Sequence, residues 1–528
     1  MRLKKREGIY KMNKFKKDPI EYNQKVLFPT NIFDLLSKGH ECYIYKDLID
    51  LLDTKAVEKK YSYIGQNAYH PRLILGILIY AYSHGVFSSR EIEKRCNEDL
   101  GFMYISHLNC PNFRVLSDFR KINNEFFKLC FVQTVKLARE SGLASLGHVS
   151  LDGSKFKADS SKHKAMSYKR LKESDKELTD EIDALLKKAS LCDEEEDADH
   201  GKLSGYEISE ELKIKEKRQS IIRKAKDELE KRESDLNPGK EIDDKKQISF
   251  ADPDAMIMGD KGKFEYSYNG QISVDKDNQI IVGEHLSRIS NDKQEVEPAL
   301  SEISSSTGKL PDTMSLDNGY MSGKNLEKFS ETEIDVYIAT GKGEPMPEAI
   351  EEKNKGKKNQ QSESSEEKKI VKFRKEKFRY DIKSDTFICP GNKQLEFKTQ
   401  YKNGTKIYQS EKEICLNCKY YNRCCNVKTG KARIINSDDK EAFRQEMKDK
   451  MKLESSREIY RRRKVIVEPV FGQIKHVLGF RGFCVRGYKK VCGEFSLICG
   501  AHNIKKIVTS IKKGVVRPNG GKLLKNGG

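Results

Sequence analysis

A change of sequence pattern near Gly147 constrains the fold of this chain more than any other feature. Residues 148–158, HVSLDGSKFKA, alternate as a half-buried strand does. Strand patterns return downstream, with helical patterns around 295–303 and from Ser322 onward. The downstream strand segments are 264–274, 279–286, 313–317 and 334–340. Three strands, a helix, a strand, a helix and a last strand predict an α/β core in which helices cover a sheet.

Helical patterns precede this core, from Ile32 to about Phe127. The run His70–Ser83 places apolar residues on one face at helical spacing. Ser88 and Ser89 form an N-cap signature for the next helix, and Ser117 is predicted to cap a helix within 111–127. Short helices with Arg and Lys between them fit a helix-turn-helix-like DNA-binding domain, and they fit a small helical bundle equally well.

Two segments of unusual composition interrupt the core. Residues 165–245 are nearly all charged and helix-favouring, and their apolar positions recur at helical spacing. These apolar positions include Leu171, Leu178, Ile182 and Leu185. The pattern predicts an inserted helical hairpin whose charges form a solvated face. Residues 344–370 have almost no apolar content and are predicted to be a disordered loop.

Composition indicates a polyanionic partner. The chain has 528 residues, a formal net charge of +19 and a pI near 9.1. Such an excess of positive charge favours nucleic acid, although a basic but otherwise ordinary enzyme has the same signature. No stretch of about 18 apolar residues exists, so no transmembrane helix is expected. The basic N-terminus has no apolar signal region, and the 13 cysteines are therefore expected to be reduced in a cytoplasm.

Two aspartates follow apolar strand patterns. Asp152 follows Val149-Ser150-Leu151 and precedes Gly153, and Asp317 follows Met314-Ser315-Leu316. Carboxylates at the ends of neighbouring strands point to the sheet edge where α/β proteins build sites. Two such groups can share a divalent cation such as Mg²⁺, which prefers oxygen ligands. A single Asp at the end of a strand more often caps a turn. The hypothesis of a metal site therefore depends on the presence of two such aspartates.

A third acid lies in a strongly basic segment near the C-terminus. Glu468 is followed by Pro469, which predicts that a helix begins there. Lys475 lies seven residues after Glu468, so both are expected on one helical face. Glu468 could complete a metal site, and Lys475 could contact a phosphate. The neighbouring positive residues expected to hold DNA are Arg461, Arg462, Arg463, Lys464 and Arg481.

Five cysteines gather in one short region. Cys389, Cys415, Cys418 and Cys424 offer four thiolates around a Cys-x2-Cys core, which is compatible with a small tetrahedral zinc site. Cys425 competes with Cys424 for the fourth position. The alternative is a loop-rich insertion with reduced, metal-free thiols. Cys484, Cys492 and Cys499 follow apolar residues and are expected in the core.

Long motifs give the chain a family resemblance. It resembles the DDE transposases of bacterial insertion sequences, and most closely the IS1182-like group. The matching segments are HPRLILGILIYAYSHGVFSSREIEKRC (70–96), PNFRVLSDFR (111–120), LDGSKFKADSS (151–161), DPDAMIM (252–258), YNGQISVD (268–275), SLDNGYMS (315–322) and YRRRKVIVEPVFGQIKHVLGFRGF (460–483). In one departure from the related Tyr-x2-Arg-x3-Glu-x6-Lys signature, Tyr460 and Arg463 lie one residue too far upstream of Glu468.

The resemblance implies an α/β RNase H-like catalytic core, a mixed sheet flanked by helices. It implies that Asp152, Asp317 and Glu468 bind Mg²⁺ or Mn²⁺ and carry out two-metal DNA cleavage and strand transfer. The expected partners are double-stranded DNA, as terminal inverted repeats and target, and a further copy of the chain in a dimer or higher oligomer. Similar Cys-rich insertions in relatives favour structural zinc. The expected location is the bacterial cytoplasm, with the nucleoid, and no membrane partner.

The expected organisation has seven parts. They are a flexible basic arm (1–30), a helical N-terminal DNA-binding domain (31–145), the first part of the core (146–343) with its charged helical insertion (165–250), a disordered linker (344–379), a Cys-rich zinc-ribbon-like insertion (380–430), the C-terminal helices of the core with the catalytic Glu (431–515) and a disordered tail (516–528).

Two alternative functions fit the same motifs. The chain could be a transposase-derived DNA-binding protein without catalysis, although the presence of all three acids argues against this. It could also be a nuclease with the same core that hydrolyses DNA and does not join strands. Residues 268, 269 and 271 are expected on the second strand beside the site, where Tyr, Asn and Gln are as easily plain sheet residues as catalytic ones.

Overall fold

The structure is a computed structural model that describes residues 32–61, 68–160, 165–196, 205–260, 262–340, 373–425, 430–519 and 522–525. The predicted arm at 1–30 and most of the predicted linker at 344–379 lie outside these ranges. Within them, no helix combines the length and the apolar character that a membrane crossing requires.

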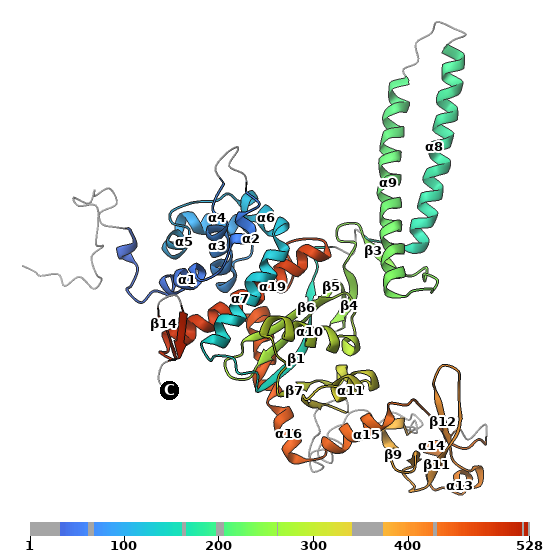
Figure 1. Cartoon of the computed structure of the whole chain (residues 1–528). Coiled ribbons are helices and arrows are strands. Elements are labelled where there is room, and N and C mark those ends of the chain that lie inside the picture. The colour runs from blue at the N-terminus through green and yellow to red at the C-terminus, as the bar shows by residue number, and fades with distance from the viewer. Residues whose placement is uncertain are drawn as a thin grey trace, which may run out of the picture.

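A mixed sheet forms the centre of the molecule (Figure 1). Its middle strand, β1 (His148–Lys157), runs antiparallel to β5 (Lys263–Asp275) and parallel to β7 (Thr313–Leu316). β8 (Asp335–Ile338) adds to β7 in parallel. The other edge of the long strand β5 pairs with β4 (Met256–Asp260) and with β6 (Ile281–Ser287). Each segment predicted as a core strand is therefore a strand.

Helices cover both faces of this sheet. Side chains alternate between the faces of a strand, so Gly270 and Ser273 of β5 face opposite sides. Gly270 faces Phe495 of α19 (Tyr488–Lys512), whereas Gly283, the partner of Ser273, faces α10 (Val296–Thr307). The short helix α11 (Gly323–Ser330) follows β7. A mixed sheet flanked by helices fits the expected RNase H-like core.

The N-terminal helices share a hydrophobic core with the sheet and α19. They are η1 (Ile32–Leu35), α1 (Glu41–Asp50), α2 (Lys55–Glu58), α3 (Pro71–Ser83), α4 (Ser89–Glu98), α5 (Leu100–Ile105), α6 (Phe113–Ile122) and α7 (Asn124–Glu140). Ser88 is the N-cap residue of α4, as predicted. The predicted cap at Ser117 is wrong, because Ser117 lies inside α6 and the Asn112 side chain accepts a hydrogen bond from the backbone N–H of Val115.

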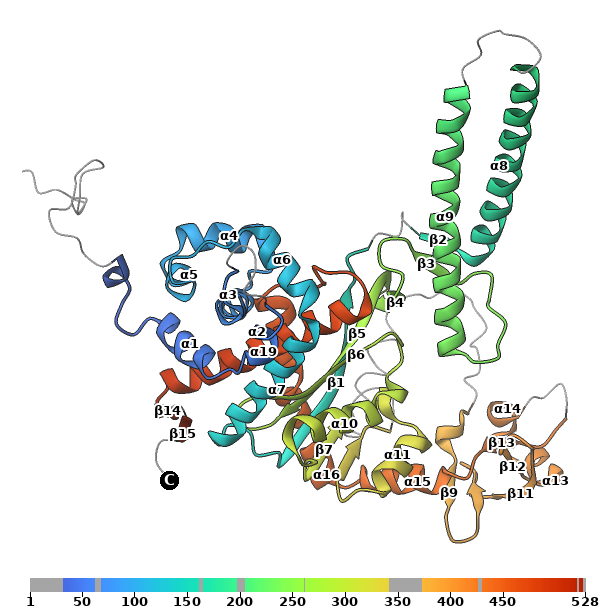
Figure 2. The same ribbon diagram turned by 45° about the horizontal axis from the view of Figure 1, so that its top comes forward.

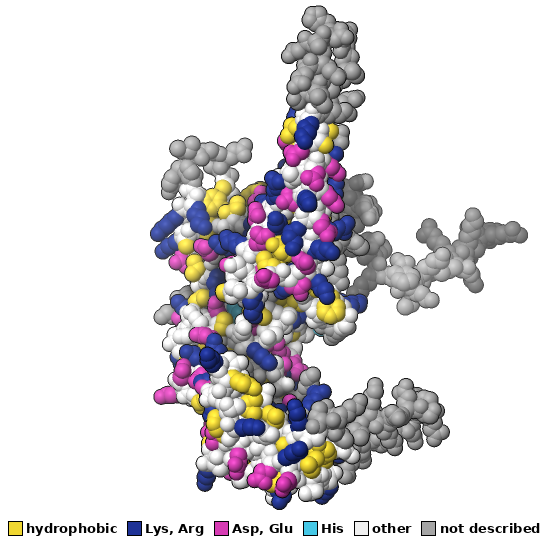
Figure 3. Space-filling view, turned by 90° about the vertical axis from the view of Figure 1, so that its right-hand side faces the viewer, with side chains coloured by type: hydrophobic (Ala, Val, Ile, Leu, Met, Phe, Trp, Pro, Cys, Tyr) yellow, Lys and Arg dark blue, Asp and Glu magenta, His cyan; other side chains and the backbone are white. Residues whose placement is uncertain are grey.

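The charged insertion forms the predicted helical hairpin. Its helices α8 (Tyr168–Glu196) and α9 (Gly205–Leu236) project from the body of the molecule (Figures 1 and 2). At the base of the hairpin, β2 (Ala165–Ser167) pairs with β3 (Gln247–Ser249). The base also has a small hydrophobic core of its own. That core contains Leu171, Leu178, Ile222, Ala225, Leu229 and Ile248. Lys and Arg side chains are interspersed with Asp and Glu along the hairpin (Figure 3).

The Cys-rich insertion forms a second, antiparallel sheet in the order β13-β12-β11-β10-β9. Its elements are β9 (Arg379–Asp381), β10 (Thr386–Ile388), β11 (Gln394–Gln400), β12 (Lys406–Gln409), β13 (Ile434–Ser437), α13 (Lys412–Leu416) and α14 (Tyr421–Cys424). Phe387, Leu395 and Tyr408 form its buried centre. Because β13 completes this sheet, the unit extends beyond the predicted end at residue 430.

The C-terminal region returns to the central sheet through short helices. They are α15 (Glu441–Lys450), α16 (Glu454–Arg461), α17 (Arg463–Ile466), α18 (Glu468–Gly472) and the π-helical turn η7 (Gln473–Val477), which precede α19. The expectation of a disordered tail at 516–528 is wrong for its described residues. There, β14 (Val516–Asn519) pairs with β15 (Lys522–Lys525). Val516 and Leu523 of these strands are buried in the main core.

Candidate active site

The first two acids lie side by side on the central sheet. Leu151 of β1 pairs with Leu316 of β7, so Asp152 and Asp317 occupy the next positions of the two strands. β7 ends there, whereas β1 continues to Lys157 along β5. Gly153 is therefore a strand residue, paired with Gln271. Neighbouring strands thus bring the two carboxylates together, as the sequence predicted.

Local backbone groups fix both carboxylates. The Oδ1 of Asp317 accepts a hydrogen bond from the N–H of Gly319 at 2.7 Å, at the start of the turn η4 (Asn318–Tyr320). The Oδ1 of Asp152 accepts one from the N–H of Gly153 at 3.0 Å. The second oxygen of Asp152, Oδ2, faces the guanidinium of Arg463 instead.

Arg463 connects Asp152 to Glu468. One guanidinium nitrogen, Nη2, lies 2.9 Å from Oδ2 of Asp152, and the other, Nη1, lies 3.6 Å from Oε1 of Glu468. The Arg463 side chain is 11% exposed, whereas that of Glu468 is 49% exposed. The sequence placed Arg463 among the surface DNA contacts, but the structure places it inside the acid cluster.

A break in the helix accounts for the extra residue between Arg463 and Glu468. α17 ends at Ile466 and α18 begins at Glu468, with Pro469 in its first turn as predicted. Pro cannot donate the backbone hydrogen bond that would continue the earlier helix. Arg463 reaches both Asp152 and Glu468 in spite of the added residue.

The acids are held in an environment that penalises negative charge. Burial raises the pKa of Asp152 to about 6, the Arg463 guanidinium opposes this rise, and the carboxylates of Asp317 and Asp292 add to it. Buried carboxylates that repel one another are stabilised by a cation between them. Arg463 supplies one such charge.

Lys475 faces β1. Its Nζ lies 2.5 Å from Oγ of Ser154 and 2.6 Å from the carbonyl oxygen of Lys155. The segment between Glu468 and Lys475 is not one regular α-helix, because α18 ends at Gly472 and the π-helical turn η7 follows it. The other predicted DNA contacts, Arg461, Arg462, Lys464 and Arg481, are exposed.

Sequence reasoning missed a fourth acid, Asp292, in the turn η3 (Asp292–Gln294) before α10. Asn269 Nδ2 and Gln271 Nε2 both donate to its Oδ1, at 2.9 and 2.8 Å. Both amides are buried side chains of β5, and the Tyr320 hydroxyl donates to Gln271 Oε1. Asp292 stands in a short polar segment without a strand or helix pattern, so no sequence signal marked it.

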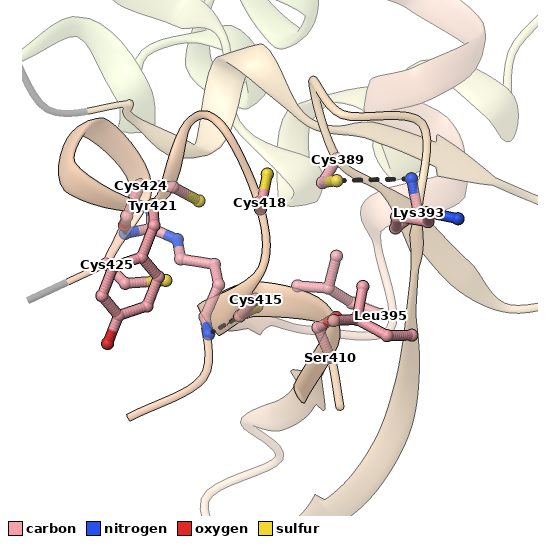
Figure 4. A pocket seen from close by; sticks show the side chains of 11 residues that line it. Cys389, Lys393, Leu395, Ser410, Cys415, Cys418, Tyr421, Cys424 and Cys425 are labelled. Atoms are coloured by element: carbon pink, nitrogen blue, oxygen red, sulfur yellow. Dashed lines mark hydrogen bonds between the residues drawn. The ribbon is translucent and has the colours of Figure 1, made fainter. Parts of the chain in front are cut away.

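The Cys-rich insertion places its thiols around one pocket. Cys389, Cys415, Cys418, Cys424 and Cys425 line this pocket (Figure 4). The backbone N–H of Lys393 donates to Sγ of Cys389 at 3.3 Å, and that of Arg433 donates to Sγ of Cys415 at 3.5 Å. Burial raises the pKa of Cys425 to about 12. Cys484, expected in the core, is exposed, whereas Cys499 is buried.

In the described part of the chain, no three Asp, Glu, His or Cys side chains converge closely enough to enclose a metal ion. The donor chemistry of both clusters nevertheless fits distinct ions. Carboxylate oxygens suit Mg²⁺ or Mn²⁺, and thiolates suit Zn²⁺. At the acid cluster, a Cβ added to Gly319 would meet Asp317 Oδ1 at 2.8 Å and Asp292 Oδ2 at 3.2 Å, so this glycine leaves room where the acids meet.

Two parts of the chain match family models of transposase domains. Residues 388–508 match a family model described as a transposase DDE domain, and residues 30–122 match one described as a transposase domain. The first match includes Glu468 but neither Asp152 nor Asp317. No curated protein matches the chain. One similar solved structure is a piggyBac transposase synaptic complex with hairpin DNA, at 9% identity over 92% of this chain and 78% of that chain, with a TM-score of 0.29.

Proposed function

We propose that this chain is an insertion-sequence DNA transposase that binds terminal inverted repeats and carries out metal-dependent strand cleavage and strand transfer. The observation that carries the proposal is the position of the three acids relative to the central sheet and to Arg463. Asp152 and Asp317 lie on adjacent strands, and Arg463 links Asp152 to Glu468. The transposase matches at 30–122 and 388–508 support the same function.

Asp152, Asp317 and Glu468 would hold Mg²⁺ or Mn²⁺. When bound, such ions activate water or a 3′-hydroxyl and stabilise the leaving oxygen. The protein's own part is to position the acids: the N–H groups of Gly153 and Gly319 orient Asp152 and Asp317. Arg463 keeps Asp152 ionised against its burial, so the carboxylate is ready for a cation.

DNA would approach the acids across the exposed positive side chains near them. Arg461, Arg462, Lys464 and Arg481 are exposed on the segment that also carries Glu468. Contacts between such side chains and phosphates release counterions, so DNA affinity should fall steeply as salt concentration rises. Transposition joins two DNA ends, and we propose that a dimer or higher oligomer of this chain assembles on them.

The test is a cleavage and joining assay on DNA that carries the inverted repeats flanking the coding region. With Mg²⁺, wild-type protein should cut at the repeat ends and join them to target DNA. Asp152→Ala should abolish both steps while DNA binding is retained. Equal cleavage by both proteins would reject the metal assignment. Cleavage without joining of pre-cut ends would identify a nuclease, and binding without cleavage an inactive derivative.

We also propose that Cys389, Cys415, Cys418 and Cys424 hold a structural zinc ion. The hydrogen bonds from backbone N–H groups to Cys389 and Cys415 support this, because such bonds orient and stabilise thiolate ligands. Zinc measured on purified protein should approach one equivalent per chain and fall in Cys415→Ser. Less than half an equivalent in the wild type would count against the site.

A further inference from the structure

Asp292 lies where the two strand-end aspartates meet. A Cβ on Gly319 would lie 2.8 Å from Oδ1 of Asp317 and 3.2 Å from Oδ2 of Asp292, so the two carboxylates approach the same point. A Cβ on Gly153 would meet Nε2 of Gln271 first and would lie 2.9 Å from Oδ1 of Asp292, on the face of β1 opposite to the Asp152 side chain. Gly319 therefore lets Asp292 approach Asp317, because a larger side chain at this position would collide with both carboxylates.

The hydrogen bonds of Asp292 leave one oxygen available. Asn269 and Gln271 donate to Oδ1, and in the described part of the chain Oδ2 has no hydrogen-bond donor. The carboxylate also caps no backbone N–H, in contrast to the neighbouring Asn291, whose side chain accepts from the N–H of Lys293. A role in holding the turn η3 therefore does not explain the Asp292 side chain.

The groups that hold Asp292 are themselves buried and aligned. Asn269 and Gln271 are fully buried on one face of β5, and Tyr320, three residues after Asp317, donates to Gln271. The Oδ1 of Asn269 is buried without a hydrogen-bond partner. Buried polar atoms are normally satisfied, so this oxygen is an acceptor left open on the same amide that binds Asp292, and a water molecule can use it.

We propose that Asp292 is a fourth carboxylate of the cation site and shares a divalent ion with Asp317. This inference rests on the proposed function, since it assigns a further residue to the same site. Asn269, Gln271 and Tyr320 are positioning residues, because they act through Asp292. The ion class is hard and oxygen-preferring, as for the other three acids.

The test measures Mn²⁺ binding to the purified full-length protein by calorimetry or by the electron paramagnetic resonance of free Mn²⁺. Asp292→Asn keeps the shape and the acceptor for the two amides, and it should weaken Mn²⁺ binding about tenfold or more. Asp277→Asn is the matched control, because Asp277 is an exposed aspartate in the turn after β5, and its Mn²⁺ affinity should equal that of the wild type. Thermal unfolding in EDTA should be alike for all three proteins.

Asp317→Asn separates the assignment of Asp292 from the proposed function. If Asp317→Asn loses Mn²⁺ binding while Asp292→Asn binds as the wild type does, the fourth carboxylate is rejected and the proposed function stands. If neither Asp152→Asn nor Asp317→Asn changes Mn²⁺ binding, the cation site itself is rejected, and Asp292 with it. If Asp292→Asn does not fold, Asp292→Glu replaces it in the same measurement. The assignment requires the carboxylate at a fixed distance from the ion. Mn²⁺ affinity of Asp292→Glu equal to that of the wild type would therefore overturn the assignment of Asp292.

Discussion

A positive side chain of the protein itself balances part of the negative charge around Asp152. Arg463 is buried between Asp152 and Glu468 and contacts both. Burial alone would favour the protonated form of Asp152, and the guanidinium opposes this effect. A positive side chain of this kind neutralises part of the charge that a divalent cation would otherwise balance.

His502 gives a pH dependence of stability. Burial lowers the pKa of His502 to about 4, and Lys505 and Lys506 add to this effect. An unfolded histidine has a pKa of about 6.5. Between pH 6.5 and pH 4 the unfolded chain therefore takes up a proton that the folded chain does not, so the free energy of unfolding falls as pH falls.

His502→Gln removes this proton uptake. Between pH 7 and pH 5 the variant should lose on the order of 2 kcal/mol less stability than the wild type. Chemical or thermal unfolding at both pH values measures the difference. An identical pH dependence in the two proteins would show that His502 is not held neutral in the folded state.

Single residues show how far the sequence alone could identify the site. Asp152, Asp317 and Glu468 could be proposed because each has a local signature, a strand pattern or an isolated acid in basic sequence. Asp292 could not, because its importance comes from Asn269 and Gln271, which lie more than 20 residues earlier in another element. Arg463 is predicted from the sequence as a DNA contact, because only the folded chain shows that its guanidinium lies near Asp152 and Glu468.

At the scale of elements, β1 organises the site. It pairs with β5 along nearly its whole length and with β7 only up to Leu151, so its edge beyond Asp152 is free of β7. Lys475 contacts this stretch of β1 through Ser154 and Lys155. The strand thus connects the acids to the C-terminal helices.

Sequence periodicity predicts the strands and helices of the core. The predictions fail where contacts with distant residues or neighbouring caps determine the local structure. Ser117 has the residue type of a cap, but Asn112 begins α6 and satisfies its free N–H groups. The terminal segment has few apolar residues, yet Val516 and Leu523 are buried against the main core and form a hairpin. Neither outcome is visible in a local pattern.

The hairpin α8–α9 should be dispensable for folding. Its apolar core lies at the base, around Leu171, Leu178 and Leu229, and the two helices pack mainly on each other. Replacement of residues 186–210 by a short Gly-Ser linker should therefore leave the thermal midpoint of the core nearly unchanged. Loss of soluble, cooperatively unfolding protein would show that the distal hairpin supports the core.

At the scale of the whole molecule, the N-terminal helices and the catalytic core are joined by a buried polar network. Arg120 of α6 lies 3.6 Å from Glu494 of α19, and the Tyr82 hydroxyl of α3 donates to Glu494 at 2.5 Å. Arg120 and Glu494 are 4% and 1% exposed. The network thereby connects the N-terminal helices to α19, which packs on the sheet that carries Asp152.

Arg120→Ala should destabilise the protein by about 3–5 kcal/mol, because it leaves Glu494 buried without a counter-charge. Arg114→Ala removes an exposed arginine from the same helix and should change stability by less than about 0.5 kcal/mol. Thermal or urea unfolding of the two variants measures this. Equal stability of the two would contradict the role of the buried network.

The central claim is that Asp152, Asp317 and Glu468 act as one metal-dependent site. The most direct measurement is the rate of DNA nicking with Mg²⁺ by Asp152→Asn, Asp317→Asn, Glu468→Gln and the Asp152→Asn, Glu468→Gln double variant. Each single change should lower the rate about a thousandfold or more, and the double variant should lose little further, because residues that act as a unit are not additive. Nicking at the wild-type rate by any single variant, with DNA binding intact, would contradict the claim.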